Sequence, residues 1–128
     1  MKLLLDTHTL IWFLREPHVL PPQVLTAIEE AGKDAMVSIA SLWEIAIKLS
    51  LNKLALPQPF DALFPDAVSD SGMTLLPVEF RHLTALSQMP WHHRDPFDRL
   101  LIAQAQVDGL TLVSVDRHFP LYGIPLLW

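Results

Sequence analysis

Four acidic residues occur where the geometry of the chain could gather them into one metal site. Asp6 and Asp116 each follow an apolar run, and Glu44 and Asp98 fall near the starts of segments with helical spacing. Carboxylate oxygens are the ligands that Mg²⁺ and Mn²⁺ prefer. A cation held by several carboxylates can activate water for attack on a phosphodiester, with no protein nucleophile required. These four residues are therefore the candidate metal ligands and catalytic residues.

Electrostatic repulsion between these acids would require a counter-ion. Four carboxylates about 7 Å apart would repel by roughly 2 kcal/mol per pair at an effective dielectric near 20. All the pairs together approach the whole stability of a domain. The chain contains no cysteine, and the four positions include no histidine. We therefore expect Mg²⁺ or Mn²⁺ with oxygen ligands, and zinc is disfavoured.

Each acid also has a purely structural explanation. Asp95, a further acid, precedes a proline and fits a helix N-cap. The stretch 41–44 fits a capping box, and Asp116 could bond its own backbone in a turn. Asp6 ends an apolar strand, where a buried carboxylate costs free energy, and this favours a functional role. The metal hypothesis depends on the acids converging.

Alternating strands and helices would position these acids. Apolar runs predict strands at 2–5, 35–38, 73–76, 111–115 and 124–127. Helical spacing predicts helices over about 9–14, 22–31, 41–51, 60–71, 79–89 and 96–107. This order implies an α/β fold, a three-layer α/β/α sandwich with a mainly parallel sheet. In such sheets ligands bind beyond the carboxyl ends of the strands, where Asp6 and Asp116 are expected.

Composition predicts a single domain over residues 1–128, without repeats or a long linker. The absence of cysteine excludes disulfides and thiolate ligands. A hydrophobic content of 51% fits buried parallel strands and an apolar surface for a partner. The first apolar run is too short for a signal peptide or a membrane span, so we expect a cytoplasmic protein with no membrane contact.

The formal charge of −5 disfavours a generic basic surface for nucleic acid but is compatible with a nuclease that recruits cations. Aromatic and cationic groups near the acids are candidate RNA contacts: Trp91, His92, His93, Arg94, Arg99 and Arg117. A solvated loop and rim salt bridges are the alternatives. The adjacent pair His92 and His93 is not expected to share a metal. Thr7 and Ser114 flank site acids and could bond a carboxylate or a metal-bound water, or be ordinary turn hydroxyls.

Four stretches, in this order and at these spacings, form a specific signature. They are residues 3–8 (LLLDTH), 38–48 (SIASLWEIAIK), 95–105 (DPFDRLLIAQA) and 112–119 (LVSVDRHF). The chain resembles PIN-domain nucleases, and within that family the VapC-type toxins of toxin–antitoxin pairs. By this resemblance Asp6, Glu44, Asp98 and Asp116 match the family's acidic metal-site positions, and Asp95 is an extra acid shared by a subset.

The resemblance implies an endoribonuclease that hydrolyses RNA with Mg²⁺ or Mn²⁺. It also implies the toxin of a pair, a homodimer and inhibition by a cognate antitoxin. The chain shows no DNA-binding module of its own. Two other classes stay open: a non-catalytic interaction domain whose acids are caps, and a phosphotransfer or phosphatase-like domain with Asp6 as nucleophile. The latter expects a second carboxylate two residues on, where this chain has His8, or beside Asp6, where it has Leu5.

Overall fold

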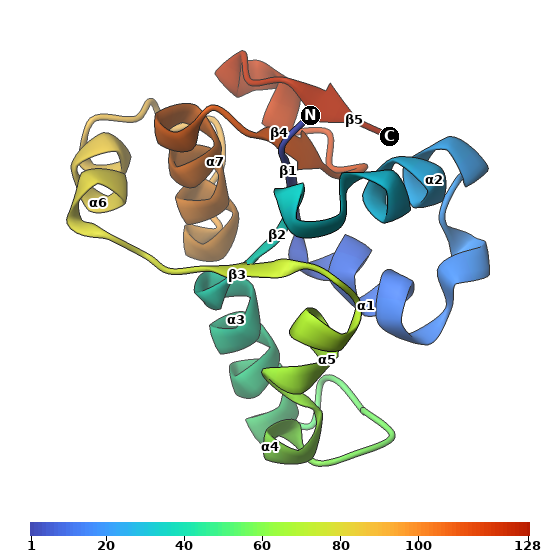
Figure 1. The fold of residues 1–128 in the computed structure, drawn as a ribbon. Helices are drawn as coiled ribbons and strands as arrows, with labels where there is room; N and C mark the ends of the chain where they lie inside the picture. The colour runs from blue at the N-terminus through green and yellow to red at the C-terminus, as the bar shows by residue number, and fades with distance from the viewer.

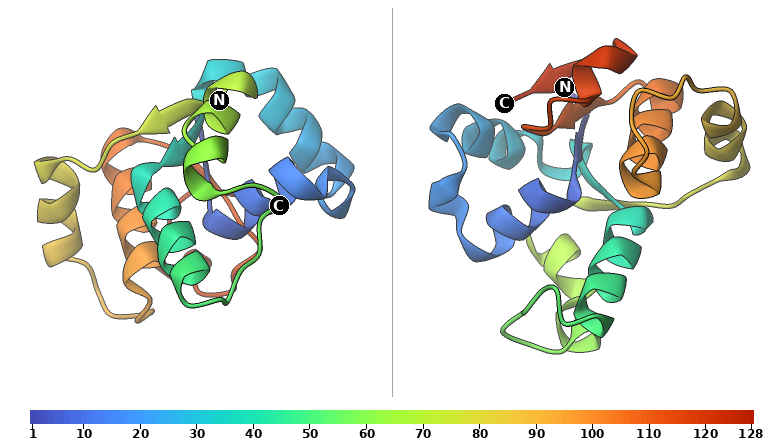
Figure 2. Two further views of the ribbon diagram at one scale, coloured as in Figure 1. Left: turned by 90° about the horizontal axis from the view of Figure 1, so that it is seen from below. Right: turned by 180° about the vertical axis from the view of Figure 1, so that it is seen from behind.

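The computed structural model describes residues 1–128 and contains a five-stranded sheet in which every paired strand is parallel. The strand order is β3-β2-β1-β4-β5. The strands are β1 (Leu3–Leu5), β2 (Ala35–Ser38), β3 (Thr74–Leu76), β4 (Thr111–Val113) and β5 (Leu126–Leu127). Helices flank the sheet on both sides (Figures 1 and 2). The predicted α/β class with a parallel sheet is confirmed.

Seven α-helices connect the strands. They are α1 (Thr7–Arg15), α2 (Pro22–Ala31), α3 (Ile39–Ser50), α4 (Phe60–Leu63), α5 (Asp66–Asp70), α6 (Phe80–Ser87) and α7 (Pro96–Asp108). Three short 3₁₀ helices cover Pro17–Val19, Gly32–Asp34 and Phe119–Tyr122. None of the helices has the length and apolar character needed to cross a membrane.

The sheet separates two apolar cores, as the side-chain alternation of a strand requires. Leu3 and Leu5 of β1 belong to the core formed with α1, α2, α3 and α5. Leu4 points to the opposite core, which α7 dominates through Leu101 and Ile102. All three β1 residues are buried, so the central strand is apolar on both faces, as parallel strands under two helical layers usually are.

Several predicted boundaries are wrong, and three of the differences have a clear physical reason. The helix expected over 60–71 is divided into α4 and α5 at Pro65, which lacks the N–H that a continuous helix would use. Helix α3 begins two residues earlier than predicted, directly after β2. Strand β4 ends at Val113 rather than at residue 115, because Ser114 is already in the turn that leads to Asp116.

Candidate active site

A cavity of about 420 Å³ lies beyond the carboxyl ends of β1 and β4. The acids that line it are the five singled out in the sequence: Asp6, Glu44, Asp95, Asp98 and Asp116. The remaining lining residues are His8, Trp12, Lys48 and Val115. Segments far apart in the chain thus converge at the sheet edge where ligands bind in this class of fold. The cavity holds five carboxylates against one lysine.

Asp6 is fixed between strand and helix. It follows β1 without a loop and caps α1, since its Oδ1 accepts a hydrogen bond of 2.8 Å from the backbone N–H of Thr9. The residue is only 6% exposed. A buried carboxylate is costly unless it is bonded or neutralised, and the cap uses only one of its two oxygens.

Glu44 lies in the second turn of α3, not in the first as predicted. Ser38 caps this helix by accepting a 3.0 Å hydrogen bond from the N–H of Ala40. The capping box considered as an alternative over 41–44 is therefore absent, and the buried hydroxyl of Ser41 makes no hydrogen bond. Glu44 is instead held by two side chains, because Thr7 Oγ1 donates to Oε1 at 2.6 Å and Lys48 Nζ lies 2.9 Å from Oε2.

Asp95 and Asp98 begin α7 together. Asp95 is the N-cap, and its Oδ1 accepts hydrogen bonds from the N–H groups of Phe97 at 2.9 Å and Asp98 at 3.1 Å. Burial and the charges of Asp95 and Glu44 raise the pKa of Asp98 to about 7, although its hydrogen bond with His93 lowers it in part. His93 and Lys48 thus balance only part of the negative charge crowded around Asp98.

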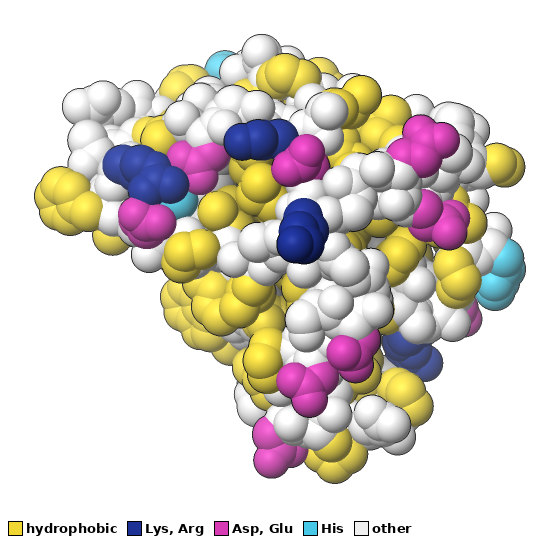
Figure 3. All heavy atoms as spheres, in the orientation of Figure 1, with side chains coloured by type: hydrophobic (Ala, Val, Ile, Leu, Met, Phe, Trp, Pro, Cys, Tyr) yellow, Lys and Arg dark blue, Asp and Glu magenta, His cyan; other side chains and the backbone are white.

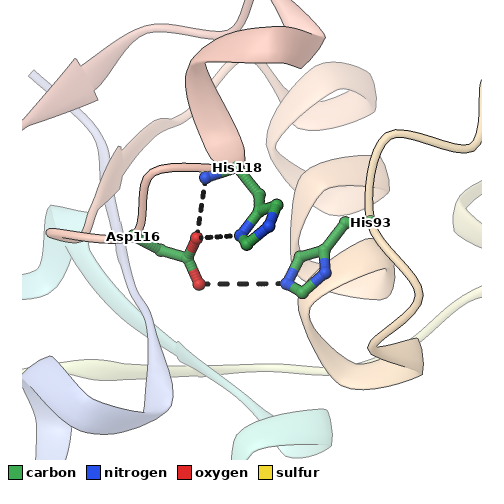
Figure 4. A group of neighbouring side chains, drawn as sticks. All are labelled: His93, Asp116 and His118. Atoms are coloured by element: carbon green, nitrogen blue, oxygen red, sulfur yellow. Dashed lines mark hydrogen bonds and ion pairs between the residues drawn. The ribbon is translucent and has the colours of Figure 1, made fainter.

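Asp116 is held by two histidines (Figure 4). The backbone N–H of His118 donates to Asp116 Oδ1 at 2.8 Å, and Nδ1 of its ring lies 2.9 Å from the same oxygen. Nε2 of His93 lies 3.8 Å from Asp116 Oδ2 and 2.8 Å from Asp98 Oδ2. Burial raises the pKa of Asp116, but the His118 hydrogen bonds and the histidine charges outweigh this and lower it overall.

These histidines correct the expectation of a site without imidazole. The rings of His93 and His118 stack with centroids 4.4 Å apart, and they and Asp116 offer ligand atoms within 4.8 Å of one another. His92 packs on the ring of Tyr122 instead, with the ring centroids 5.1 Å apart, and is not part of this group. His118 was missed, and only its position two residues after Asp116 could have indicated it.

The two predicted hydroxyls make different contacts. Thr7 bonds the carboxylate of Glu44, while Ser114 Oγ accepts a 3.0 Å hydrogen bond from the N–H of Asp116 and acts within the turn. The ion pair of Glu44 with Lys48 was not predicted, although their i,i+4 spacing on a helix could have indicated it.

The predicted RNA contacts differ in exposure. Trp91, Arg94 and Arg117 are exposed, and none of the ion pairs in the structure includes either arginine. Arg99 is buried without an acidic partner, so the rim salt bridge considered for it is wrong. Trp43 on α3 is 58% exposed and packs edge-on against Phe97.

The model of the PIN domain family matches residues 3–124. This chain belongs to the PIN domain family. The match includes all five acids of the cavity, so the family resemblance carried by the four sequence stretches is confirmed. No curated protein matches the sequence.

Solved structures share the fold of this PIN domain. DNA-bound VapBC from Salmonella typhimurium aligns with a TM-score of 0.76 at 19% identity, over 99% of this chain and 97% of that one. VapBC2 from Rickettsia felis, bound to a promoter DNA fragment, gives 0.73 at 14% identity, over 99% and 98%. FitAcB from Neisseria gonorrhoeae gives 0.67 at 17% identity, over 98% and 96%. At these identities the likeness establishes the fold.

The donor set of the PIN-domain cavity fits a divalent cation. Its five carboxylates supply the hard oxygen ligands that Mg²⁺ and Mn²⁺ prefer. A cation would also offset both causes that raise the pKa of Asp98, which are burial of its charge and repulsion by Asp95 and Glu44. Zinc was disfavoured because histidine seemed absent from the site, and that premise is wrong. Imidazole suits zinc, whereas carboxylates suit magnesium and manganese. The five carboxylates outnumber the three imidazoles, which are His8 in the lining and His93 and His118 beside it.

Proposed function

We propose that this PIN domain is an endoribonuclease that depends on Mg²⁺ or Mn²⁺ and forms a single domain over residues 1–128. The observation that carries the proposal is the cavity itself, in which five carboxylates face one lysine beyond the carboxyl ends of the central strands. The chain belongs to the PIN family, whose members are nucleases. Phosphodiester hydrolysis by a metal-activated water is the chemistry that such a cavity supports.

Asp6, Glu44, Asp98 and Asp116 would hold the cation, with Asp95 at the edge of the site. The bound ion would supply an activated water and would stabilise the charge that develops on the phosphate. Thr7 orients Glu44 by its 2.6 Å hydrogen bond, and Lys48 fixes the other carboxylate oxygen. His93 and His118 hold Asp98 and Asp116 through their ring nitrogens. These partners hold the carboxylates of Glu44, Asp98 and Asp116 in place before any ion binds. Less conformational entropy is then lost when the ion binds.

A toxin role is part of this proposal. The aligned structures are described as VapBC and FitAcB, and another as a toxin–antitoxin complex from Klebsiella pneumoniae. These descriptions support a cognate antitoxin as the protein partner, whereas RNA as the substrate rests on the resemblance of the sequence to VapC-type toxins. A homodimer is compatible with apolar side chains left on the surface of α3, where Ile39 and Trp43 are exposed.

The test is cleavage of a pool of cellular RNA by protein freed of any co-purified partner, with Mg²⁺ or Mn²⁺ present. We expect discrete products that vanish with EDTA and with Asp6→Asn, since asparagine is as good an N-cap as aspartate and should keep α1 intact. Asp108→Asn, at the far end of α7, is the matched control and should cleave normally. Intact Mn²⁺ binding without cleavage of any RNA would contradict the ribonuclease proposal, and absent Mn²⁺ binding would favour a non-catalytic interaction domain.

A further inference from the structure

A second cavity, of about 300 Å³, lies beside the start of α7 and shares no residue with the acidic cavity. It is lined by Leu86, Ser87, Trp91, Arg94, Pro96 and Arg99. Both of its charged residues are arginines, in a chain with a formal charge of −5. The two cavities therefore present opposite charge around the same helix start.

Arg99 is a buried cation without an anion. It is 4% exposed, and its hydrogen bonds all come from Nη1, which donates to the carbonyl of Pro90 at 2.8 Å and to the hydroxyl of Tyr122 at 3.3 Å. Both acceptors are neutral, and a guanidinium carries five N–H donors. Its place in the first turns of α7 adds the positive end of the helix dipole. A buried charge of this kind is costly unless an anion compensates it.

Trp91 covers the guanidinium but leaves most of its own surface in water. The Cζ atom of Arg99 lies 3.8 Å from the indole ring, which fixes the ring by a cation–π contact. The indole is nevertheless 76% exposed, so the face turned away from Arg99 is open to solvent. An exposed aromatic face held by a rigid partner is a platform on which a nucleobase can stack.

We propose that this second cavity is a nucleotide subsite for single-stranded RNA. A phosphate of the strand contacts Arg94 and Arg99, and a neighbouring base stacks on Trp91. A nucleotide carries an anion next to a flat π-system, which matches this pair of features better than an acidic peptide does.

The position of this subsite relative to the cleaved bond of the RNA rests on the proposed nuclease function. Asp95 and Asp98 line the acidic cavity, whereas Arg94 and Arg99 line the second one. These four residues lie within six consecutive positions of the chain, with the two acids between the two arginines, so a strand that crosses the start of α7 reaches both cavities. The subsite then binds RNA on one side of the bond that is cut.

The test measures binding of a fluorescein-labelled single-stranded RNA by anisotropy, in Mg²⁺ and in an Asp6→Asn background that prevents cleavage. Trp91→Ala should weaken binding roughly 5- to 150-fold, the range for loss of one stacked base. It should leave the salt dependence unchanged, because no charge is removed. Arg94→Gln should also weaken binding and should lower the slope of log K against log salt by about 0.7, the value for one phosphate contact with a single strand.

Control variants separate the subsite from general effects. Lys33→Gln removes an equal charge at the amino end of β2, at the opposite edge of the sheet, and should not weaken binding to a comparable degree. Trp91→Phe keeps an aromatic face and should restore part of the affinity. Trp91 and Arg94 are exposed, so their variants should fold. Arg99→Lys keeps the buried charge but loses the planar group that stacks on Trp91, and it should also weaken RNA binding.

Two results distinguish the failure of this subsite from the failure of the nuclease proposal. If Trp91→Ala and Arg94→Gln bind RNA as Lys33→Gln does, the subsite is wrong, even where the wild-type protein cleaves RNA and Asp98→Asn does not. If the wild-type protein cleaves no RNA but Trp91→Ala loses RNA binding, the nuclease proposal fails while the RNA subsite is supported.

Discussion

Asp98 and Asp108 occupy opposite ends of α7, and their carboxyl groups meet opposite surroundings. Burial and the charges of Asp95 and Glu44 raise the pKa of Asp98 to about 7. At Asp108 burial also raises the pKa, but hydrogen bonds from Arg81 and His82 outweigh it and lower the pKa overall. Basic and acidic side chains adjoin each other on the α6 side of the molecule in Figure 3.

The helix dipole alone would shift the pKa values of Asp98 and Asp108 in the opposite directions. An acid near the amino end of a helix is stabilised by the dipole, and an acid near the carboxyl end is destabilised. In α7 the neighbouring side chains outweigh that effect at both ends. At the carboxyl end Arg81 Nε and His82 Nε2 each lie 3.0 Å from an Asp108 oxygen and join α6 to α7. At the amino end acids are crowded together, an arrangement that a bound cation would stabilise.

The largest expected effect is a difference in RNA cleavage between variants at the two ends of α7. Asp98→Asn should lower metal-dependent RNA cleavage at least about 100-fold, the upper range for loss of an outer partner of a metal ligand. Asp108→Asn, an identical change on the same helix, should stay within about twofold of wild type. The measurement is kcat/KM on one cleaved RNA, and equal losses in the two variants would show that the effect is structural.

A smaller effect is expected at Thr7, which touches the acidic site through Glu44. Thr7→Val removes the hydroxyl that donates to Glu44 at 2.6 Å and should cost roughly 10- to 100-fold in activity or Mn²⁺ affinity. Thr7→Ser keeps the donor and should retain most of the activity. Equal activity of the valine and serine variants would contradict a positioning role for this hydrogen bond.

The two ends should also respond oppositely in stability. In metal-free protein, Asp98→Asn removes a crowded charge and should raise the free energy of unfolding by about 1 kcal/mol, a fraction of one close charge repulsion. Asp108→Asn weakens the contacts with Arg81 and His82 and should lower it by about 1 kcal/mol, the usual net value of one hydrogen bond. Urea unfolding of both variants in EDTA measures these changes in the free energy of unfolding. Changes of the same sign in both variants would contradict the opposite surroundings assigned to the two ends of α7.

The smallest expected effect is the pH dependence of the stability that Asp108 contributes to the folded state. Folding lowers its pKa below the ordinary 3.8, so the charged form stabilises the folded state. That stabilisation is complete well above 3.8 and is lost as the pH falls through the lowered pKa. The stability difference between wild type and Asp108→Asn should therefore be constant near neutrality and shrink in acid. A difference that grows in acid would contradict the assignment.

The sequence predicted the site acids because parallel strands place their carboxyl ends at one edge, and this rule needs no tertiary detail. Asp6 and Asp116 follow adjacent strands, and the helix that carries Asp98 feeds one of them. Helix α7 was predicted to within one residue, since Pro96 begins it and Gly109, in the left-handed region at φ 68°, ends it.

Contacts between distant segments could not be predicted in the same way. His118 reaches Asp116 through a turn that also shortens β4, and Arg99 loses its expected salt bridge because it packs under Trp91 instead. The start of α3 was misplaced because Ser38 both ends a strand and caps a helix, whereas the pattern over 41–44 offered an equally plausible cap. Local patterns thus located the elements and the acids but not the side chains that hold them.

The most direct test of a metal-binding acidic site is Mn²⁺ titration of metal-free protein by isothermal calorimetry. Wild type and Asp108→Asn should bind Mn²⁺ with equal affinity, and Asp98→Asn should bind it at least about 10-fold more weakly. Equal binding by Asp98→Asn, or no Mn²⁺ binding by wild type, would contradict the assignment of the cavity to a catalytic cation.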